Sequence, residues 1–218
     1  MGSVVNATSL ALATSPEVAE LCDIVEFRAD ALAADLGGIA QSMDDCPLPA
    51  LLTVRDPVEG GMGKLDRDAR HALYFQLLPH ADFVDIEIAN LKQYPELLEE
   101  AQRHGTIVIA SFHDFNGTPD LDWLLSRIYE AKAAGVDTVK LATTTNVNLE
   151  LGRLSALQEI AILPMSTMGM GALGRVSRLL LATMGSVLNY GYLDHPTIPG
   201  QWPAQRLRTL IREMRGEE

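Results

Sequence analysis

The sequence predicts an α/β protein, a compact (β/α)8 TIM barrel that forms a single domain over residues 1–218. Short apolar runs alternate with longer amphipathic segments, and the alternation repeats along the chain at intervals of roughly 25 residues, the length of a βα unit. No linker or low-complexity segment interrupts the series. Because a pattern of runs does not show whether the sheet closes on itself, a doubly wound open sheet is the alternative.

The strand-like runs that define this repeat are centred near residues 10, 26, 52, 85, 109, 138, 163 and 188. The helical segments between them carry their own signals. Ser15-Pro16 opens the first, because serine caps a helix and proline fits its first turn. Residues 64–80 place a stripe of leucine and alanine on one helix face. Thr118-Pro119 begins a further helix, which we expect to end at Gly135.

Composition and charge restrict the partners and the location of the protein. The chain is 47% hydrophobic and 21% charged, as in ordinary globular proteins, and its net charge of −12 repels nucleic acid and anionic lipid. No apolar stretch reaches the roughly 18 residues that a membrane span needs, and the N-terminus lacks a signal-peptide pattern. Cys22 and Cys46 are too few for a disulfide framework. We therefore expect a cytoplasmic protein with a small-molecule substrate and with neither nucleic-acid nor membrane partners.

Two ionisable side chains belong to apolar, β-branched runs. His113 ends the run 106–113, and Lys140 lies in the run 136–142. A core strand has no packing reason to include an amine or an imidazole. In a parallel barrel the C-terminal ends of all strands meet at one mouth, where the chemistry takes place. An amine beside an imidazole at that mouth suggests chemistry on a carbonyl group.

Further polar residues follow the other strand-like runs. In chain order they are Glu26, Arg28, Arg55, Glu59, Glu87, Arg175, Thr197 and Gln201. Any one of them could be a solvated loop residue, and Glu26 with Arg28 could be an ion pair that plugs the barrel. His113-Asp114 could likewise be part of a hydrogen-bonded turn. So many charged groups at strand ends nevertheless favour a functional site.

A metal site and a dinucleotide site are both disfavoured. Asp82, Asp85 and Glu87 suggest a magnesium-binding set, but Asp82 and Glu87 are an odd number of residues apart and so face opposite ways along a strand. The segment Gly169-Met-Gly-Ala-Leu-Gly174 matches the pattern G-x-G-x-x-G, yet too little chain follows it to complete a dinucleotide-binding unit. We expect this glycine-rich loop to bring the backbone close to a ligand and to aim Arg175 at the mouth.

The ordered set of motifs resembles a known family. The motifs are Glu26-Phe-Arg-Ala-Asp30, Arg55 with Glu59-Gly-Gly61, Ser111-Phe-His-Asp-Phe115, Val139-Lys140, Gly174-Arg-Val-Ser-Arg178 and Pro199-Gly-Gln201. Each motif is weak alone. Together, with the histidine and the lysine on successive strands, they resemble type I 3-dehydroquinate dehydratase, the Schiff-base enzyme of the shikimate pathway. The resemblance extends from near Cys22 to the C-terminus, and it implies a (β/α)8 barrel, a homodimer and no cofactor.

The resemblance also implies a reaction, the reversible dehydration of 3-dehydroquinate to 3-dehydroshikimate, and a role for each candidate residue. Lys140 would form an imine with the substrate ketone, and His113, oriented by Glu59, would act as general acid and base. Arg175 would bind the substrate carboxylate. The remaining substrate-binding residues would be Glu26, Arg28, Arg55, Thr197 and Gln201, the last on a closing loop.

The chain departs from the family at Thr197, where the family has serine, and in its glycine-rich segment before Arg175. Two other interpretations stay open at this point. A class I aldolase or transaldolase-like barrel would share the lysine but would need a loop that binds phosphate. A catalytically silent barrel would bind a small carboxylate whether or not Lys140 is present.

Overall fold

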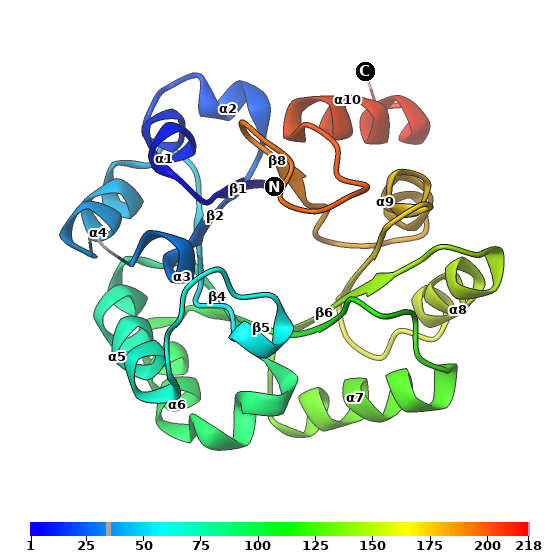
Figure 1. Cartoon of the computed structure of the whole chain (residues 1–218), viewed down its shortest axis with the longest axis horizontal. Helices are drawn as coiled ribbons and strands as arrows, with labels where there is room; N and C mark the ends of the chain where they lie inside the picture. Colours follow the sequence, from blue (N-terminus) through cyan, green and yellow to red (C-terminus); the bar gives the residue numbers. More distant parts are fainter. Residues whose placement is uncertain (34–35, 218) are drawn as a thin grey trace.

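The computed structural model describes residues 1–33 and 36–217, and within them parallel strands curl round a common axis with helices on the outside (Figure 1). The strands are β1 (Gly2–Val4), β2 (Val25–Arg28), β3 (Ala50–Thr53), β4 (Phe83–Glu87), β5 (Ile107–Asp114), β6 (Thr138–Thr144), β7 (Met165–Met170) and β8 (Gly191–Tyr192). Their order in the sheet is β7-β6-β5-β4-β3-β2-β1-β8, and every pair in this series is parallel. The predicted α/β barrel is confirmed.

The barrel closes between β7 and the segment that precedes β8. The amide of Val187 donates a hydrogen bond of 3.0 Å to the carbonyl of Met165, and the amide of Thr167 donates one of 3.1 Å to Ser186 Oγ. β8 itself has only two residues and pairs with β1. Closure on this side therefore depends on single hydrogen bonds to an irregular segment instead of a strand ladder.

The helices surround the sheet (Figure 1). They are α1 (Ala7–Ala13), α2 (Val18–Leu21), α3 (Ala29–Leu32), α4 (Leu36–Asp45), α5 (Arg67–Leu77), α6 (Pro95–His104), α7 (Leu121–Ala133), α8 (Asn148–Glu159), α9 (Gly174–Thr183) and α10 (Ala204–Arg215), with 3-10 turns η1 (Pro57–Glu59), η2 (Leu78–His80) and η3 (Ile88–Gln93). Aspartate side chains cap two of the predicted helices, Asp66 for α5 and Asp120 for α7. Gly135 follows α7 with φ +79°, the left-handed conformation expected where a helix stops. None of the helices in the described part of the chain is long and apolar enough to cross a membrane.

The first predicted strand is wrong. The run near residue 10 belongs to α1, and the strand that enters the barrel is Gly2–Val4. Leucine and alanine favour a helix over a strand, and Asn6 caps this one by accepting a hydrogen bond from the amide of Ser9. The seventh and eighth strands also begin later than predicted, because Pro164 has no amide to donate within a ladder and residues 186–190 form the irregular closing segment.

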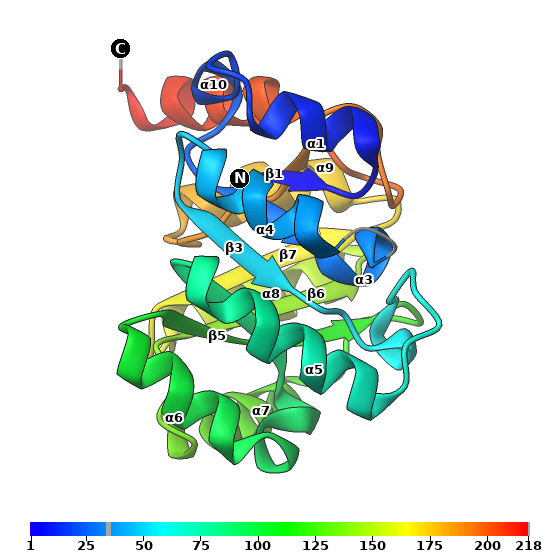
Figure 2. The same cartoon turned by 90° about the vertical axis from the view of Figure 1, so that its left-hand side faces the viewer.

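Inward-facing side chains of the barrel change from apolar to polar along the strands. Alternate residues point inward, and at the start of β3, β4 and β5 they are Leu51, Phe83 and Ile109. Two residues later the same face carries Thr53, Asp85 and Ser111, all fully buried. Figure 2 shows the strand arrowheads pointing to one side, where η1 also lies. The polar layer thus lies toward the C-terminal ends of the strands, where catalysis is expected in a barrel.

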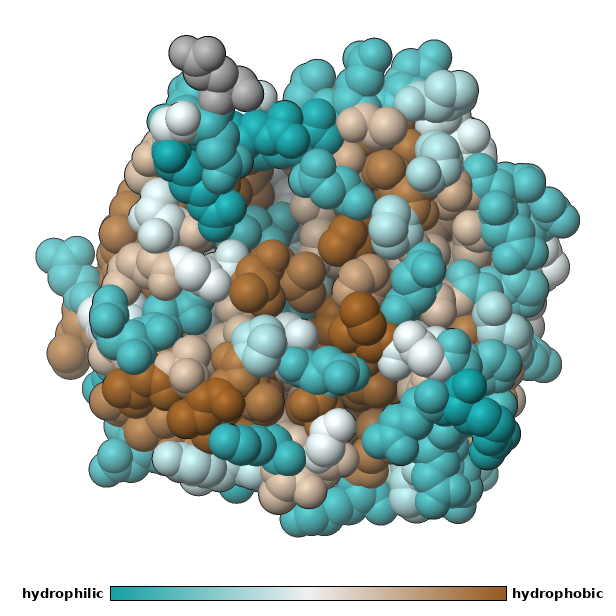
Figure 3. Space-filling model, turned by 180° about the vertical axis from the view of Figure 1, so that it is seen from behind, coloured by the Kyte–Doolittle hydropathy of each residue, from teal (hydrophilic) through white to brown (hydrophobic). Residues whose placement is uncertain are grey.

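The opposite face of the molecule carries a separate cavity. Figure 3 shows this side, with apolar residues toward its centre and hydrophilic ones round most of its rim. A cavity of about 500 Å³ opens between α10 and residues 185–189 and is bordered by Arg208, Arg212 and Arg215. None of the residues that the sequence assigned to the site lines it. This cavity is therefore separate from the polar layer at the C-terminal ends of the strands.

Candidate active site

A cavity of about 200 Å³ lies at the C-terminal ends of the strands. Its wall includes all but one of the residues assigned from the sequence, namely Glu26, Arg28, Arg55, Glu59, His113, Lys140, Thr197 and Gln201. Lys140 and His113 come from the paired strands β6 and β5, in which Ser111 faces Lys140 and His113 faces Ala142. The amine and the imidazole therefore face the same space, as the sequence predicted.

Lys140 is buried among partners for a positive charge. Its Nζ lies 2.9 Å from Asp85 Oδ2 and 3.7 Å from Glu26 Oε1. It also lies 4.1 Å from the centre of the Tyr190 ring. Glu26 in turn accepts hydrogen bonds from Ser3 and Thr53. The amine of β6 is thus accommodated in the core because acidic groups on β4 and β2, which are not adjacent to β6 in the sheet, compensate it.

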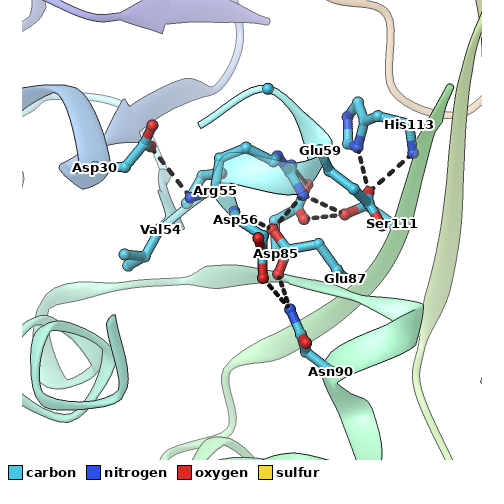
Figure 4. Close-up of polar contacts among 12 residues, drawn as sticks. Asp30, Val54, Arg55, Asp56, Glu59, Asp85, Glu87, Asn90, Ser111 and His113 are labelled. Carbon is cyan, nitrogen blue, oxygen red and sulfur yellow. Dashed lines mark hydrogen bonds and ion pairs between the residues drawn. The ribbon is translucent and has the colours of Figure 1, made fainter. Parts of the chain in front are cut away.

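Asp85 joins Lys140 to an ion network that runs through the barrel. Burial alone would raise the pKa of the Asp85 carboxyl, but Arg55 and Lys140 outweigh it and hold that pKa well below its ordinary value. Arg55 Nη2 lies 2.9 Å from Asp85, and its Nη1 lies 2.8 Å from Glu87 (Figure 4). Ser111 donates a hydrogen bond of 2.5 Å to Asp85. Asp85 is thereby a permanent anion beside the amine.

The network continues from Arg55 to the outer side of the barrel. Glu87 accepts hydrogen bonds from Arg70 at 2.6 Å and from Asn90 at 2.9 Å. Arg70 also pairs with Asp56, which follows Arg55 in the chain. Both guanidinium groups and Glu87 are buried, so their mutual contacts fix the direction of the Arg55 side chain.

His113 contacts Glu59, the residue that the family resemblance implies would orient it. Glu59 Oε2 lies 3.0 Å from His113 Nδ1 and accepts a hydrogen bond of 2.9 Å from the His113 amide (Figure 4). Burial, Arg55 and Lys140 lower the pKa of His113 well below its ordinary value. Burial, with a smaller contribution from Glu87, raises the pKa of Glu59 to about 8 against the influence of Arg55. A neutral imidazole is the form that can accept a proton.

Arg28 does not pair with Glu26. It binds Asp30 through two hydrogen bonds, of 2.9 Å and 2.8 Å, and Asp30 also accepts from the amides of Arg55 and Met62. In place of an ion pair between Glu26 and Arg28, the structure has a bidentate pair between the last residue of β2 and Asp30 in α3. This arrangement ties Arg28 to the loop that carries Glu59.

The loop before α10 covers part of the cavity. Gln201 Oε1 accepts hydrogen bonds from the amide of Thr197 at 2.7 Å and from its hydroxyl at 3.2 Å. The amide of Gly171 donates to the carbonyl of Pro199. Thr197 and Gln201 therefore form one folded unit at the edge of the cavity.

Arg175 lies outside this cavity. It is exposed, its guanidinium is 4.9 Å from the centre of the Trp202 ring, and its Nε donates a weak hydrogen bond of 3.4 Å to the Gln201 carbonyl. Trp202 donates back to the carbonyl of Arg175. These contacts fasten the covering loop to α9, and they do not point the arginine at the mouth.

Arg178 occupies the place expected for Arg175. It lines the cavity, is 1% exposed, and donates a hydrogen bond of 2.8 Å to the carbonyl of Tyr190. Its Nε has no hydrogen-bond partner, and no carboxylate pairs with it among the residues that the structure describes. Burial lowers the pKa of Arg178 to about 10, so the group stays charged at neutral pH. A buried cation in this state is a site for an anion.

The glycines before Arg175 serve packing within the chain. A Cβ added to Gly169 would lie 2.6 Å from Ser177 Oγ, and one added to Gly174 would lie 2.9 Å from the Cα of Gly200. Ser177 Oγ accepts a hydrogen bond from the Gly169 amide. The close passage of α9 and the covering loop thus requires glycine in this segment, and the approach of a ligand to its backbone stays a prediction.

Among the wall and network residues that were not assigned from the sequence, Asp85, Arg178 and Tyr190 contact Lys140 or carry a charge into the cavity wall. The signal for Arg178 was present, because the buried face of α9 is Gly174, Ser177, Arg178, Leu181 and Ala182, a helical stripe that excludes Arg175. The sequence pattern presents Asp85 only as a potential metal ligand. It is engaged by Arg55 and Lys140, and no group of three potential metal ligands occurs within residues 1–33 and 36–217.

Comparisons with known proteins show the family of the chain. Residues 4–218 match the family model of type I 3-dehydroquinase. The 3-dehydroquinate dehydratase of Methanocella arvoryzae is 35% identical over 191 residues, which cover 87% of this chain and 86% of that relative. The corresponding protein of Methanothrix thermoacetophila is 34% identical over 194 residues, covering 88% and 82%. The crystal structure of 3-dehydroquinate dehydratase from Geobacillus kaustophilus HTA426 has a TM-score of 0.86 at 25% identity, covering 99% of this chain and 90% of that one. The chain therefore belongs to the type I 3-dehydroquinase family.

Proposed function

We propose that this chain catalyses the reversible dehydration of 3-dehydroquinate to 3-dehydroshikimate through an imine on Lys140. The observation that carries the proposal is a cavity that Lys140, a neutral His113 and the unpaired cation Arg178 all line. The relatives that share most of the chain are named for this reaction. The whole of residues 1–218 would act as one catalytic domain without a cofactor.

Lys140 would act as the nucleophile. After losing a proton, its Nζ adds to the ketone carbon, and the former carbonyl oxygen leaves as water. The resulting iminium withdraws electrons and acidifies the neighbouring carbon. Asp85 supports this step because it lies 2.9 Å from Nζ and remains an anion that balances the positive nitrogen.

His113 would move the protons. Its neutral imidazole removes a proton from the carbon next to the iminium, and the same group then protonates the hydroxyl that departs as water. Glu59 holds the ring in place through Nδ1, which leaves Nε2 for the substrate. Hydrolysis of the imine would release the unsaturated ketone and return Lys140.

The arginines and the covering loop would bind the rest of the substrate. Arg178, in place of Arg175, is the group that we assign to the carboxylate, because it is buried, charged and without an acidic partner among the described side chains. Glu26, Arg28, Arg55, Thr197 and Gln201 remain the proposed contacts to hydroxyl groups and to the closed loop, since all of them line the cavity. A homodimer and a cytoplasmic location stay predictions.

Borohydride reduction tests the proposal. The purified chain is incubated with 3-dehydroquinate and sodium borohydride, and intact-mass and peptide analysis should find a reduced adduct on Lys140. Lys140→Ala should give no adduct and no turnover. An adduct with a phosphorylated sugar ketone instead would favour an aldolase. Ligand binding that survives Lys140→Ala, without turnover in the wild type, would favour a silent barrel.

A further inference from the structure

Tyr190 presents its aromatic face to the amine of Lys140. The centre of the ring is 4.1 Å from Nζ, and the residue is 4% exposed. Tyr190 lies immediately before β8, and the buried Arg178 donates a hydrogen bond of 2.8 Å to its carbonyl. The position of the ring is therefore fixed by the segment that closes the barrel, and the ring is part of the cavity wall.

The ring that meets Lys140 is an uncharged phenol. Burial first, and then the charges of Glu26 and Asp85, raise the pKa of Tyr190 well above its ordinary value. The hydroxyl has no hydrogen-bond partner among the residues that the structure places. The contact with Lys140 thus comes from the aromatic face, whose electron density attracts a cation within about 6 Å.

The proposed imine changes what the nitrogen can contact. An ammonium group has three N–H donors, whereas the iminium nitrogen, now bonded to the substrate carbon, keeps only one. At most one of the contacts to Asp85 and Glu26 can then remain a direct hydrogen bond. Attraction to the ring needs no N–H, so it persists when the ammonium becomes an iminium.

We propose that Tyr190 is a positioning residue whose aromatic face stabilises the positive charge of the Lys140 iminium. This inference rests on the imine proposed above. In the step concerned, the neutral carbinolamine takes up a proton on its hydroxyl, loses water, and leaves the positive charge on Nζ. The ring attracts the charged product of this step and not the neutral carbinolamine, so it shifts the equilibrium between these two substrate-bound forms toward the iminium.

A fluorine series at position 190 tests the role of the face. The full chain is prepared with Tyr190→Phe and with phenylalanines that carry one, two or three ring fluorines, which withdraw electron density while nearly preserving shape. The readouts are the fraction of Lys140 trapped by borohydride at saturating 3-dehydroquinate, where the iminium competes with the neutral carbinolamine and not with the free ammonium, together with kcat and KM. Tyr190→Phe keeps the face and should trap within about twofold of wild type. Each added fluorine should lower the trapped fraction, to a total loss of about 3-fold to 30-fold.

The outcomes separate this inference from the proposed function. Equal trapping across the fluorine series would overturn the role of the face, because the shape of the side chain hardly changes within it. A loss with Tyr190→Phe as large as with the trifluorinated ring would assign the effect to the hydroxyl and would also overturn the inference. Absence of any adduct in the wild type would instead refute the imine itself.

Discussion

The Lys140 ammonium forms a buried ion pair of 2.9 Å with Asp85, and the same carboxylate lies 2.9 Å from Arg55. One anion thereby compensates two cations at the centre of the barrel. Asp85→Asn keeps the shape but leaves both cations with too little negative charge. We expect this substitution to lower the free energy of unfolding by about 3–5 kcal/mol, measured by urea denaturation.

Asp68→Asn is the matched control for Asp85→Asn. Asp68 also pairs with an arginine, Arg67, at 3.3 Å, but its side chain is 87% exposed. Water already solvates both partners, so the control should unfold at the same urea concentration as wild type. If Asp85→Asn behaved like this control, the compensation of Lys140 and Arg55 would have to come from elsewhere.

The raised pKa of Glu59 should appear in the pH dependence of stability. The folded chain binds a proton at Glu59 up to a pKa of about 8, whereas the unfolded chain releases it near 4.5. The folded state therefore binds more protons over this range, and this contribution to stability is lost as pH rises through about 8. His113 makes a contribution of opposite sign to the pH dependence of stability, because its pKa is lowered in the folded chain. That contribution no longer changes with pH above 6.5, the ordinary pKa of histidine.

Glu59→Gln isolates that contribution. Between pH 6.5 and 8, the difference in unfolding free energy between wild type and Glu59→Gln should change by up to about 1.4 kcal/mol per pH unit, with wild type losing stability as pH rises. The comparison cancels other groups that titrate in this range, including the N-terminus, whose pKa burial lowers. A difference independent of pH would show that Glu59 is already ionised in the folded state.

Loss of His113 should separate imine formation from proton transfer. In His113→Ala the amine of Lys140 and its partner Asp85 remain, so borohydride should still trap an adduct. Turnover should fall by about 10²–10⁴-fold, the usual contribution of a positioned general acid and base. His104→Ala, on the exposed surface of α6, should change neither quantity. Failure of the adduct to form would assign His113 to an earlier step.

The strand periodicity predicted the barrel because most strands carry runs of apolar, β-branched residues. Such runs favour a strand in most structural contexts. The first predicted strand is the exception. Ser-Leu-Ala-Leu-Ala alternates like a strand, but an asparagine cap and good helix formers make it α1, while the three residues of β1 are too few to give a periodic signal. Closure of the barrel could not be predicted from the periodicity either, because it depends on the irregular segment 186–190.

The direction of a candidate site residue could be predicted where the residue lies on a strand, and less so where it lies on a helix. Lys140 and His113 interrupt apolar strands, so their direction follows from alternation. Arg175 and Arg178 lie in the first half of α9, and the residue at which the helix starts decides which of them faces the barrel. The roles of Asp85 and Tyr190 could not be predicted, because they depend on contacts with Lys140, which is far from both in the sequence.

Arg178→Met tests the assignment of the substrate carboxylate. The substitution removes the buried cation and keeps an apolar side chain in the cavity wall. KM for 3-dehydroquinate should rise by about 10- to 100-fold, as expected for a lost hydrogen bond between charged groups. Stability should stay within about 1 kcal/mol of wild type, because the lost bond to the Tyr190 carbonyl is offset by removal of an uncompensated buried charge.

Arg175→Met provides the comparison, since Arg175 is an arginine three residues away on the same helix but outside the cavity. Its contacts to Trp202 and to the Gln201 carbonyl fasten the covering loop, so its loss should affect loop closure more than the carboxylate. We expect KM to change by less than about threefold, because the contact of an exposed arginine with an aromatic ring is weak. The two arginines exchange roles if Arg175→Met raises KM strongly while Arg178→Met leaves it unchanged. In that case the covering loop would have to move and carry Arg175 into the mouth when substrate binds.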